Sequence, residues 1–204
     1  MKFVAVEGVD GAGKSTLVAA LAESLIADGY SVLTTREPGG TPLAESIRTF
    51  LLSDEGATIP KREQLQLVHK GRVDHVGTKI RPALDEGTIV ISDRYELSSW
   101  VYQVAHEQDE LEHVFQTMKQ ELDEQLGDFL PTYIMLDLPD TEVERRLKQS
   151  LKLNHFDATS IEAIAKRREA YEQGIVKVGS PYHVLDATQE REILVQNARI
   201  ALGL

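Results

Sequence analysis

The chain carries Gly8-Val9-Asp10-Gly11-Ala12-Gly13-Lys14-Ser15, which fits the phosphate-binding pattern G-x-x-x-x-G-K-[ST]. The apolar run at 2–7 reads as a short buried strand, and apolar residues recur at helical spacing over 16–27. The glycine-rich loop between them therefore lies at a helix N-terminus. Unpaired backbone N–H groups and the positive end of the helix dipole attract anions there. This arrangement predicts a nucleotide-phosphate site.

Each polar residue of the loop has an expected task. The glycines let the backbone close around phosphate oxygens, and the Ser15 hydroxyl would take one position on a magnesium ion. Lys14 would reach the terminal phosphates, and we expect its side chain to face them rather than the core. The alternative is a glycine-rich turn with an incidental lysine. The strand before the loop and the helix after it favour the phosphate site.

Composition and charge narrow the class of protein. The length of 204 residues suits one domain with its own core. A formal net charge of −11 argues against a general nucleic-acid or acidic-membrane binder, so a phosphorylated substrate must meet locally placed arginines. The chain has no cysteine, which excludes disulfides and thiolate-metal sites. With no basic leader and no run long enough to span a membrane, we expect a cytoplasmic location.

Five strand-like runs alternate with helical stretches. The runs are rich in Val, Ile and Leu, as expected of strands buried on both faces, and lie at 2–7, 31–35, 88–92, 132–137 and 182–186. The helical stretches are 41–52, 62–86, 107–127, 140–150, 158–178 and 189–202. This alternation predicts an α/β fold with a five-stranded parallel sheet flanked by helices on both faces. Ligands of such sheets collect at the carboxyl ends of the strands.

Arg36-Glu37-Pro38-Gly39-Gly40-Thr41 follows the second strand. A proline and two glycines predict a tight loop, and Thr41 is a candidate helix N-cap. The loop would hold the Arg36 guanidinium at the sheet edge, where it could clamp a second phosphate group with two hydrogen bonds. A surface turn with a solvated arginine fits equally well, so both interpretations stay open.

Ser92-Asp93-Arg94-Tyr95 follows the third strand. An aspartate at the end of a buried strand is where P-loop enzymes keep the carboxylate that serves magnesium. The metal needs only that carboxylate, so the adjacent Arg94 indicates a positive group that faces a second phosphate. The alternative is an Asp-Arg pair on the surface.

Taken in order, these motifs resemble those of the bacterial thymidylate kinases. The resemblance rests on Glu7-Gly8, the loop through Thr16, the segment 36–41, Asp93-Arg94-Tyr95, Ser98-Ser99 and Tyr102-Gln103, and continues to Asp186-Ala187-Thr188-Gln189. Each piece is short, but together they are specific and cover nearly the whole chain.

The resemblance implies a P-loop kinase fold and transfer of a phosphoryl group from ATP to dTMP, giving ADP and dTDP. Arg36 and Arg94 would bind the acceptor phosphate, and Asp10 would approach it and the sugar 3′-hydroxyl. The ATP phosphates would be held by Gly8, Gly11, Ala12, Gly13, Lys14, Ser15 and Thr16, and magnesium by Ser15 and Asp93. Such a transfer needs positioning and charge neutralisation rather than a covalent nucleophile or a strong base.

Other implied contacts concern the base and sugar of the acceptor. Arg72 matches the family's arginine that reads the pyrimidine edge. The remaining implied contacts are Pro38, Val68, Ser99, Tyr102, Gln103 and Tyr171. The Glu37–Pro38 bond would be cis. The family also implies a homodimer packed through helices, which the apolar stripe of Leu43, Ile47, Phe50 and Leu51 would suit, although such a stripe also suits a plain core.

The chain departs from the family pattern in the lid expected over about 146–158. His155 stands where the family has a catalytic arginine, and Lys148 and Lys152 lie near it in sequence. Histidine is only partly cationic at neutral pH, and lysine lacks the planar fork of arginine. The lid is therefore weakened, differently built or shut around another substrate.

Two other functions stay open. Val68 replaces the family's aromatic residue that stacks on thymine, and the stretch 104–108 is altered, so a same-fold kinase for a modified deoxypyrimidine monophosphate is one alternative. The other is a P-loop regulatory protein that binds nucleotide without transferring phosphate. Against it, the chain lacks a guanine-reading Asn-Lys-x-Asp and carries the acceptor arginines.

Overall fold

The computed structural model describes residues 2–107, 109–149, 156 and 160–204. Five parallel strands form one sheet in the order β2-β3-β1-β4-β5, as the alternation of strands and helices predicted. The strands are β1 (Phe3–Gly8), β2 (Val32–Arg36), β3 (Ile89–Asp93), β4 (Thr132–Asp137) and β5 (Tyr182–Asp186). Every strand lies within one residue of its predicted range.

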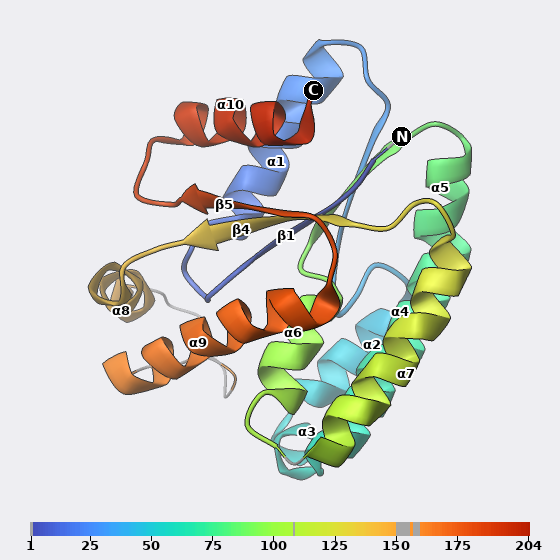
Figure 1. Cartoon of the computed structure of the whole chain (residues 1–204), viewed down its shortest axis with the longest axis vertical. Coiled ribbons are helices and arrows are strands. Elements are labelled where there is room, and N and C mark those ends of the chain that lie inside the picture. The colour runs from blue at the N-terminus through green and yellow to red at the C-terminus, as the bar shows by residue number, and fades with distance from the viewer. Residues whose placement is uncertain (1, 108, 150–155, 157–159) are drawn as a thin grey trace.

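Helices cover both faces of the sheet, as predicted. Figure 1 shows α1 (Lys14–Ala27) and α10 (Arg191–Leu202) on one face. On the other side lie α4 (Lys61–His75), α6 (Glu96–Ser99), α7 (Asp109–Leu126) and α9 (Ile161–Val178). The first strand is buried along its whole length, so the core lies on both sides of it. Among the described residues, no helix is long and apolar enough to cross a membrane.

The predicted helix 62–86 is divided in the structure. It consists of α4, the π-helical turn η1 (Val76–Ile80) and α5 (Arg81–Asp85). Pro82 has no backbone N–H to continue the α-helical ladder, and the ladder widens just before it, where the Arg81 N–H donates to the carbonyl of Val76.

Three short elements were not predicted, namely α3 (Asp54–Thr58), α6 and the π-helical turn η2 (Trp100–Val104). They are too short to show a period in the sequence. The prediction of Thr41 as an N-cap is confirmed, because its hydroxyl accepts from the Ala44 N–H at the start of α2 (Pro42–Leu51).

Strand register brings the polar strand ends together. Asp93 at the end of β3 lies opposite Val6 of β1 and Arg36 of β2. The phosphate loop leaves β1 two residues after Val6. In Figure 1 the arrowheads of β4 and β5 point toward α8 (Asp140–Gln149), which lies at the same end of the sheet. The carboxyl ends of the strands therefore frame the site.

A buried carboxyl group lies away from these strand ends, in the core. Glu96 is 1% exposed, and its Oε1 accepts a 3.2 Å hydrogen bond from the Tyr133 hydroxyl. The Lys119 ammonium lies 3.8 Å from the same oxygen, and Oε2 has no hydrogen-bond partner in the described part of the chain. Burial raises the pKa of Glu96 from 4.5 to about 7 despite the opposing effect of Lys119.

We expect Glu96→Gln to stabilise the protein above neutral pH. A carboxyl whose pKa is higher in the folded state destabilises the fold as pH rises from the unfolded pKa to the folded one. The full penalty is about 3 kcal/mol above pH 7 and vanishes below about pH 4.5. Glutamine still accepts from Tyr133 and cannot ionise.

Urea unfolding of wild type and variant at about pH 5.5 and pH 8 measures the effect. The stabilisation should be larger at the higher pH. The exposed Glu124→Gln serves as the matched control and should change neither curve. Parallel pH dependence of wild type and Glu96→Gln would show that the Glu96 proton does not couple to folding.

Candidate active site

The phosphate loop begins where β1 ends. Gly8 has a φ of 143°, and a Cβ there would lie 2.7 Å from the Leu136 carbonyl oxygen, so only glycine fits beside β4. The Lys14 ammonium donates to the carbonyls of Gly8 at 3.0 Å and Val9 at 2.8 Å. Lys14 is 7% exposed, lies outside the hydrophobic core cluster and lines the cavity that contains the loop. Burial and the neighbouring Arg94 lower the pKa of Lys14 to about 8.

Ser15 and Asp93 meet beside the loop. The Ser15 hydroxyl donates to Asp93 Oδ2, which joins the first turn of α1 to the end of β3. A hydroxyl and a carboxylate are the oxygen donors that magnesium prefers. The oxygen atoms of these two residues therefore suit a magnesium ion.

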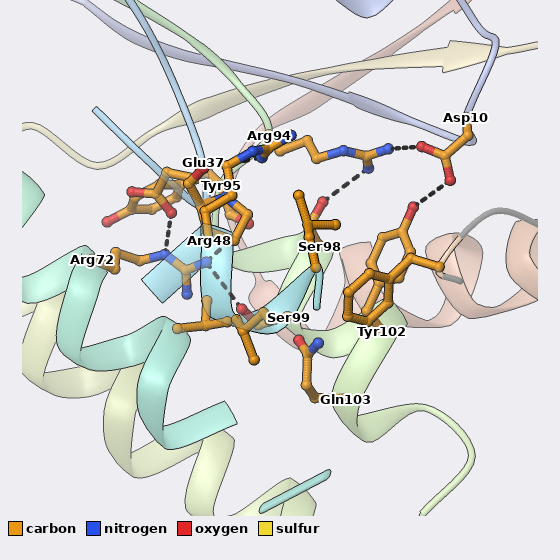
Figure 2. A pocket seen from close by; sticks show the side chains of 15 residues that line it. Asp10, Glu37, Arg48, Arg72, Arg94, Tyr95, Ser98, Ser99, Tyr102 and Gln103 are labelled. Atoms are coloured by element: carbon orange, nitrogen blue, oxygen red, sulfur yellow. Dashed lines mark hydrogen bonds and ion pairs between the residues drawn. The ribbon is translucent and has the colours of Figure 1, made fainter. Parts of the chain in front are cut away.

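Two cavities at this end of the sheet share residues with each other. The donor cavity contains the phosphate loop and is lined by Asp10, Gly11, Gly13, Lys14, Ser15, Thr16, Arg36, Glu37, Arg48, Asp93, Arg94, Arg146 and Leu147. The acceptor cavity is lined by Asp10, Glu37, Pro38, Arg48, Leu51, Leu52, Val68, Arg72, Arg94, Tyr95, Ser98, Ser99, Tyr102, Gln103 and Phe156 (Figure 2). Asp10, Glu37, Arg48 and Arg94 line both, so the two cavities meet at these charged groups.

Arg94 is held at this junction by its backbone and by its side chain. Its φ of 72° is left-handed, which is uncommon for a residue with a Cβ, and the Ser92 hydroxyl donates to its carbonyl. Figure 2 shows its guanidinium bonded to Asp10 and to the Ser98 hydroxyl. Nη1 also donates to the Tyr171 hydroxyl at 2.5 Å and lies 3.7 Å from a Glu7 oxygen.

The pKa values of the two acids beside Arg94 are shifted in opposite directions. Glu7 is fully buried, and this burial raises its pKa although Arg94 and hydrogen bonds from Tyr95 and Ser98 oppose the rise. Burial also acts to raise the pKa of Asp10, but the nearby Arg94 and Lys14 outweigh it and lower that pKa. The junction therefore holds an ionised Asp10 between cationic side chains.

Tyr102 forms another part of the acceptor-cavity wall. Its hydroxyl donates to Asp10 Oδ2 at 2.8 Å, and burial raises the pKa of Tyr102 to about 12. The guanidinium of Arg94 lies 5.2 Å from the ring centre, and that of Arg167 lies 4.0 Å from it.

The far end of the acceptor cavity is built around Arg72. Its Nε donates to Glu37, and its Nη2 donates to the Ser99 hydroxyl at 2.9 Å and the Tyr95 carbonyl at 3.3 Å. The two flanking contacts to Glu37 and Ser99 are visible in Figure 2. Burial acts to lower the pKa of Arg72, but Glu37 outweighs it and raises that pKa. The Glu37–Pro38 bond beside it is cis, as the resemblance implied.

Most predicted acceptor residues are brought together by the fold. Asp10, Pro38, Val68, Arg72, Arg94, Ser99, Tyr102 and Gln103 all line the acceptor cavity. Arg36 lies instead in the donor cavity, where its half-exposed guanidinium donates to Glu45 at 2.9 Å. Tyr171 lies behind the acceptor cavity and contacts the site through Arg94.

The predicted lid falls largely outside the described residues, and His155 and Lys152 lie there. Lys148 pairs with Glu144 along α8, 2.9 Å apart. The structure instead places Arg146 of α8 against the phosphate loop, where its Nη1 donates to the Gly11 carbonyl at 3.3 Å. Cationic side chains therefore reach the site from α8 and, through Arg167, from α9.

Sequence reasoning missed Arg48, Arg146 and Arg167. All three stand on polar positions of helices, where an arginine is ordinarily solvated. The Arg145-Arg146 and Arg167-Arg168 doublets that flank the expected lid were the available signal. The doublets alone do not say which arginine turns toward the phosphates.

Comparisons with known proteins agree with this geometry. The family model for thymidylate kinase matches residues 6–198. The thymidylate kinase of Chlamydia caviae is 36% identical over 93% of this chain and 91% of the relative. Those of Nitratidesulfovibrio vulgaris and Thermomicrobium roseum are 35% and 38% identical, over 96% and 94% of this chain and 89% and 90% of the relatives. The chain belongs to the thymidylate kinase family.

Proposed function

We propose that this enzyme transfers the γ-phosphoryl group of ATP to dTMP, giving ADP and dTDP. The observation that carries the proposal is the junction of the two cavities at Asp10, Glu37, Arg48 and Arg94. A donor phosphate on the loop and an acceptor phosphate in the second cavity would meet there. Family membership supplies the identity of the two substrates.

On the donor side, the loop residues bind and orient the ATP phosphates. Backbone N–H groups at the start of α1 face the phosphate oxygens. Lys14 exchanges two carbonyl contacts for phosphate oxygens, which favours its charged form. Arg146 approaches the same loop and adds a fixed charge.

On the acceptor side, arginines hold the dTMP phosphate in line with the donor. Arg36, Arg48 and Arg94 are the candidates, because each lines the donor cavity or the junction. The attacking oxygen is already an anionic phosphate oxygen, so no strong base is required. Asp10 and Tyr102 orient the sugar, and Arg72 with Gln103 faces the base.

We also propose that Ser15 and Asp93 serve magnesium. The ion would neutralise charge on the transferring phosphate. Asp93→Asn should therefore raise the magnesium concentration needed for half-maximal activity by about tenfold or more. The measurement is the rate against free magnesium at fixed ATP, with Ser15→Thr as the conservative control. An unchanged magnesium curve for Asp93→Asn would exclude Asp93 from metal binding.

A coupled ADP-release assay with ATP and magnesium across dTMP, dUMP, dCMP, dGMP and modified deoxypyrimidine monophosphates tests the reaction. Preferential ADP formation with dTMP is expected. Preference for a modified deoxypyrimidine monophosphate would favour the alternative kinase with that substrate. The aliphatic side chains of Leu51, Leu52 and Val68, which line the acceptor cavity, are compatible with such a base. Nucleotide binding without ADP formation would favour a regulatory protein and reject the kinase.

We propose further that residues 1–204 form one domain, that the enzyme is a homodimer and that it works in the cytoplasm. Ile47 and Leu51 of the predicted stripe pack with Val68 in a core cluster. Leu43 and Leu52 lie in and next to α2, and their apolar side chains are exposed. Their exposure supports the proposal of a dimer contact at α2. Sedimentation equilibrium of the wild type and Leu43→Glu tests the dimer, and cell fractionation tests the location.

A further inference from the structure

Thr35, His75, Glu37 and Arg72 form a series of hydrogen bonds, which we call the imidazole relay. The series runs from the half-buried Thr35 to Glu37 and Arg72 in the wall of the acceptor cavity. We propose that His75 is a positioning residue that fixes the Glu37 carboxylate, so that Arg72 faces the acceptor base and selects a carbonyl over an amino group at its edge. The inference rests on the proposed function, because it concerns the base of the proposed acceptor.

His75 is held on both ring nitrogens. The residue is 0% exposed, its Nδ1 lies 3.0 Å from Glu37 Oε1, and its Nε2 lies 2.7 Å from Thr35 Oγ1. Burial acts to raise the pKa of Glu37, but Arg72 and His75 outweigh it and lower that pKa, so this carboxyl group is ionised. An ionised carboxylate only accepts hydrogen bonds. Nδ1 therefore carries the hydrogen that binds Glu37.

Each oxygen of Glu37 has its own partner. Oε1 accepts from His75, and Oε2 accepts from Arg72 Nε. Without His75, a carboxylate held only by Arg72 could rotate and take the guanidinium with it. With both contacts, the carboxylate plane is fixed from two helical positions three residues apart on α4.

The loop after β2 is packed against the imidazole. A Cβ on Gly40 would lie 2.3 Å from His75 Nε2 and 2.7 Å from Thr35 Oγ1. The Thr41 hydroxyl donates to Asp74 at 2.5 Å, and the Lys79 ammonium donates to the Gly40 carbonyl at 3.1 Å. Arg36, the last residue of β2, comes directly before this loop. The relay therefore fixes the position of the loop next to Arg36, the proposed phosphate contact, and the orientation of Arg72, which faces the base.

The contacts of Arg72 with the protein fix which side of its guanidinium group faces the acceptor. Nε and Nη2 are used by Glu37, Tyr95 and Ser99, and the Tyr95 ring lies 5.2 Å from the guanidinium carbon. Arginine only donates hydrogen bonds. A pyrimidine with a 4-carbonyl, such as thymine, accepts from it, whereas the 4-amino group of cytosine does not.

The test compares dTMP with dCMP in wild type, His75→Leu and His75→Asn. We expect His75→Leu to weaken dTMP binding by about tenfold, as for the loss of one hydrogen bond to a charged group. The ratio of kcat/KM for dTMP to that for dCMP should fall, and KM for ATP should stay within about twofold. His75→Asn keeps a donor for Glu37 and should recover most of the preference.

Three further variants keep the test independent of folding. Thr35→Val removes the Nε2 contact from the half-buried end of the relay and should shift the dTMP:dCMP ratio in the same direction, whereas Thr35→Ser should not. His69→Leu changes a histidine on the same helix whose Nε2 contacts Glu121, and it should leave the ratio unchanged. A purely structural role would lower activity with both nucleotides alike.

Nucleotide binding is measured by calorimetry, and turnover is measured in the same variants. Together, the two measurements distinguish failure of the proposed kinase function from failure of the imidazole relay. A wild type that neither prefers dTMP nor phosphorylates it would reject the proposed function and the relay with it. A wild type that does both, while His75→Leu or Thr35→Val keeps the wild-type ratio and dTMP affinity, would overturn the relay alone.

Discussion

Replacing Lys14 by methionine should abolish phosphoryl transfer while leaving the protein folded. Methionine keeps the length of the side chain and removes its charge. Losing one charge-assisted phosphate contact in a closed site raises the barrier by about 3 kcal/mol or more, a rate loss of at least about a hundredfold. The measurement is kcat in the coupled ADP assay. A purified variant with near-normal turnover would contradict the assignment of residues 8–15 as a phosphate-binding P-loop.

The same substitution should not lower stability near neutral pH. In the structure Lys14 is buried next to Arg94, and its pKa is lowered to about 8. A lysine whose folded pKa is lowered destabilises the fold below that pKa, and stability returns as pH rises from about 8 toward the unfolded value of 10.5. Wild type should show this rise, and Lys14→Met should not. The exposed Lys148→Met is the matched control for both measurements.

The fold could be predicted because its signals are local. Apolar runs mark the strands, helical spacing marks α1, and the glycine-lysine pattern marks the turn between them. Parallel register then places Arg36 and Asp93 at one edge without further information. Short elements such as α6 were missed, because four residues show no period.

The interior of the site could not be predicted in the same way. Glu37, Arg72 and His75 are charged or polar residues that composition assigns to the surface, yet they are buried because they satisfy one another across more than thirty residues of sequence. The burial of Lys14 has the same origin, since the carbonyls that receive it are exposed only once β1 turns into the loop.

Arg94→Ala should impair use of the acceptor far more than binding of ATP. Arg94 lines the junction of the two cavities and is the side chain that neutralises Asp10 and approaches Glu7. Truncating one partner of a buried charge pair costs about 2–5 kcal/mol, so kcat/KM for dTMP should fall by about thirtyfold or more. ATP affinity, measured separately, should change by no more than about threefold, because Lys14 and Asp93 stay in place.

A second variant separates this loss from damage to the fold. Arg94→Ala leaves the buried Glu7 carboxyl without its neighbouring charge, which destabilises the protein until that group takes up a proton. Glu7→Gln combined with Arg94→Ala removes the uncompensated charge. Alanine at position 94 should adopt the backbone φ of 72° about as readily as arginine, since both residues carry a Cβ. The double variant should therefore regain stability in urea without regaining dTMP use. If dTMP affinity returns with stability, or if ATP affinity falls while dTMP affinity holds, Arg94 supports the fold or the donor rather than the acceptor phosphate.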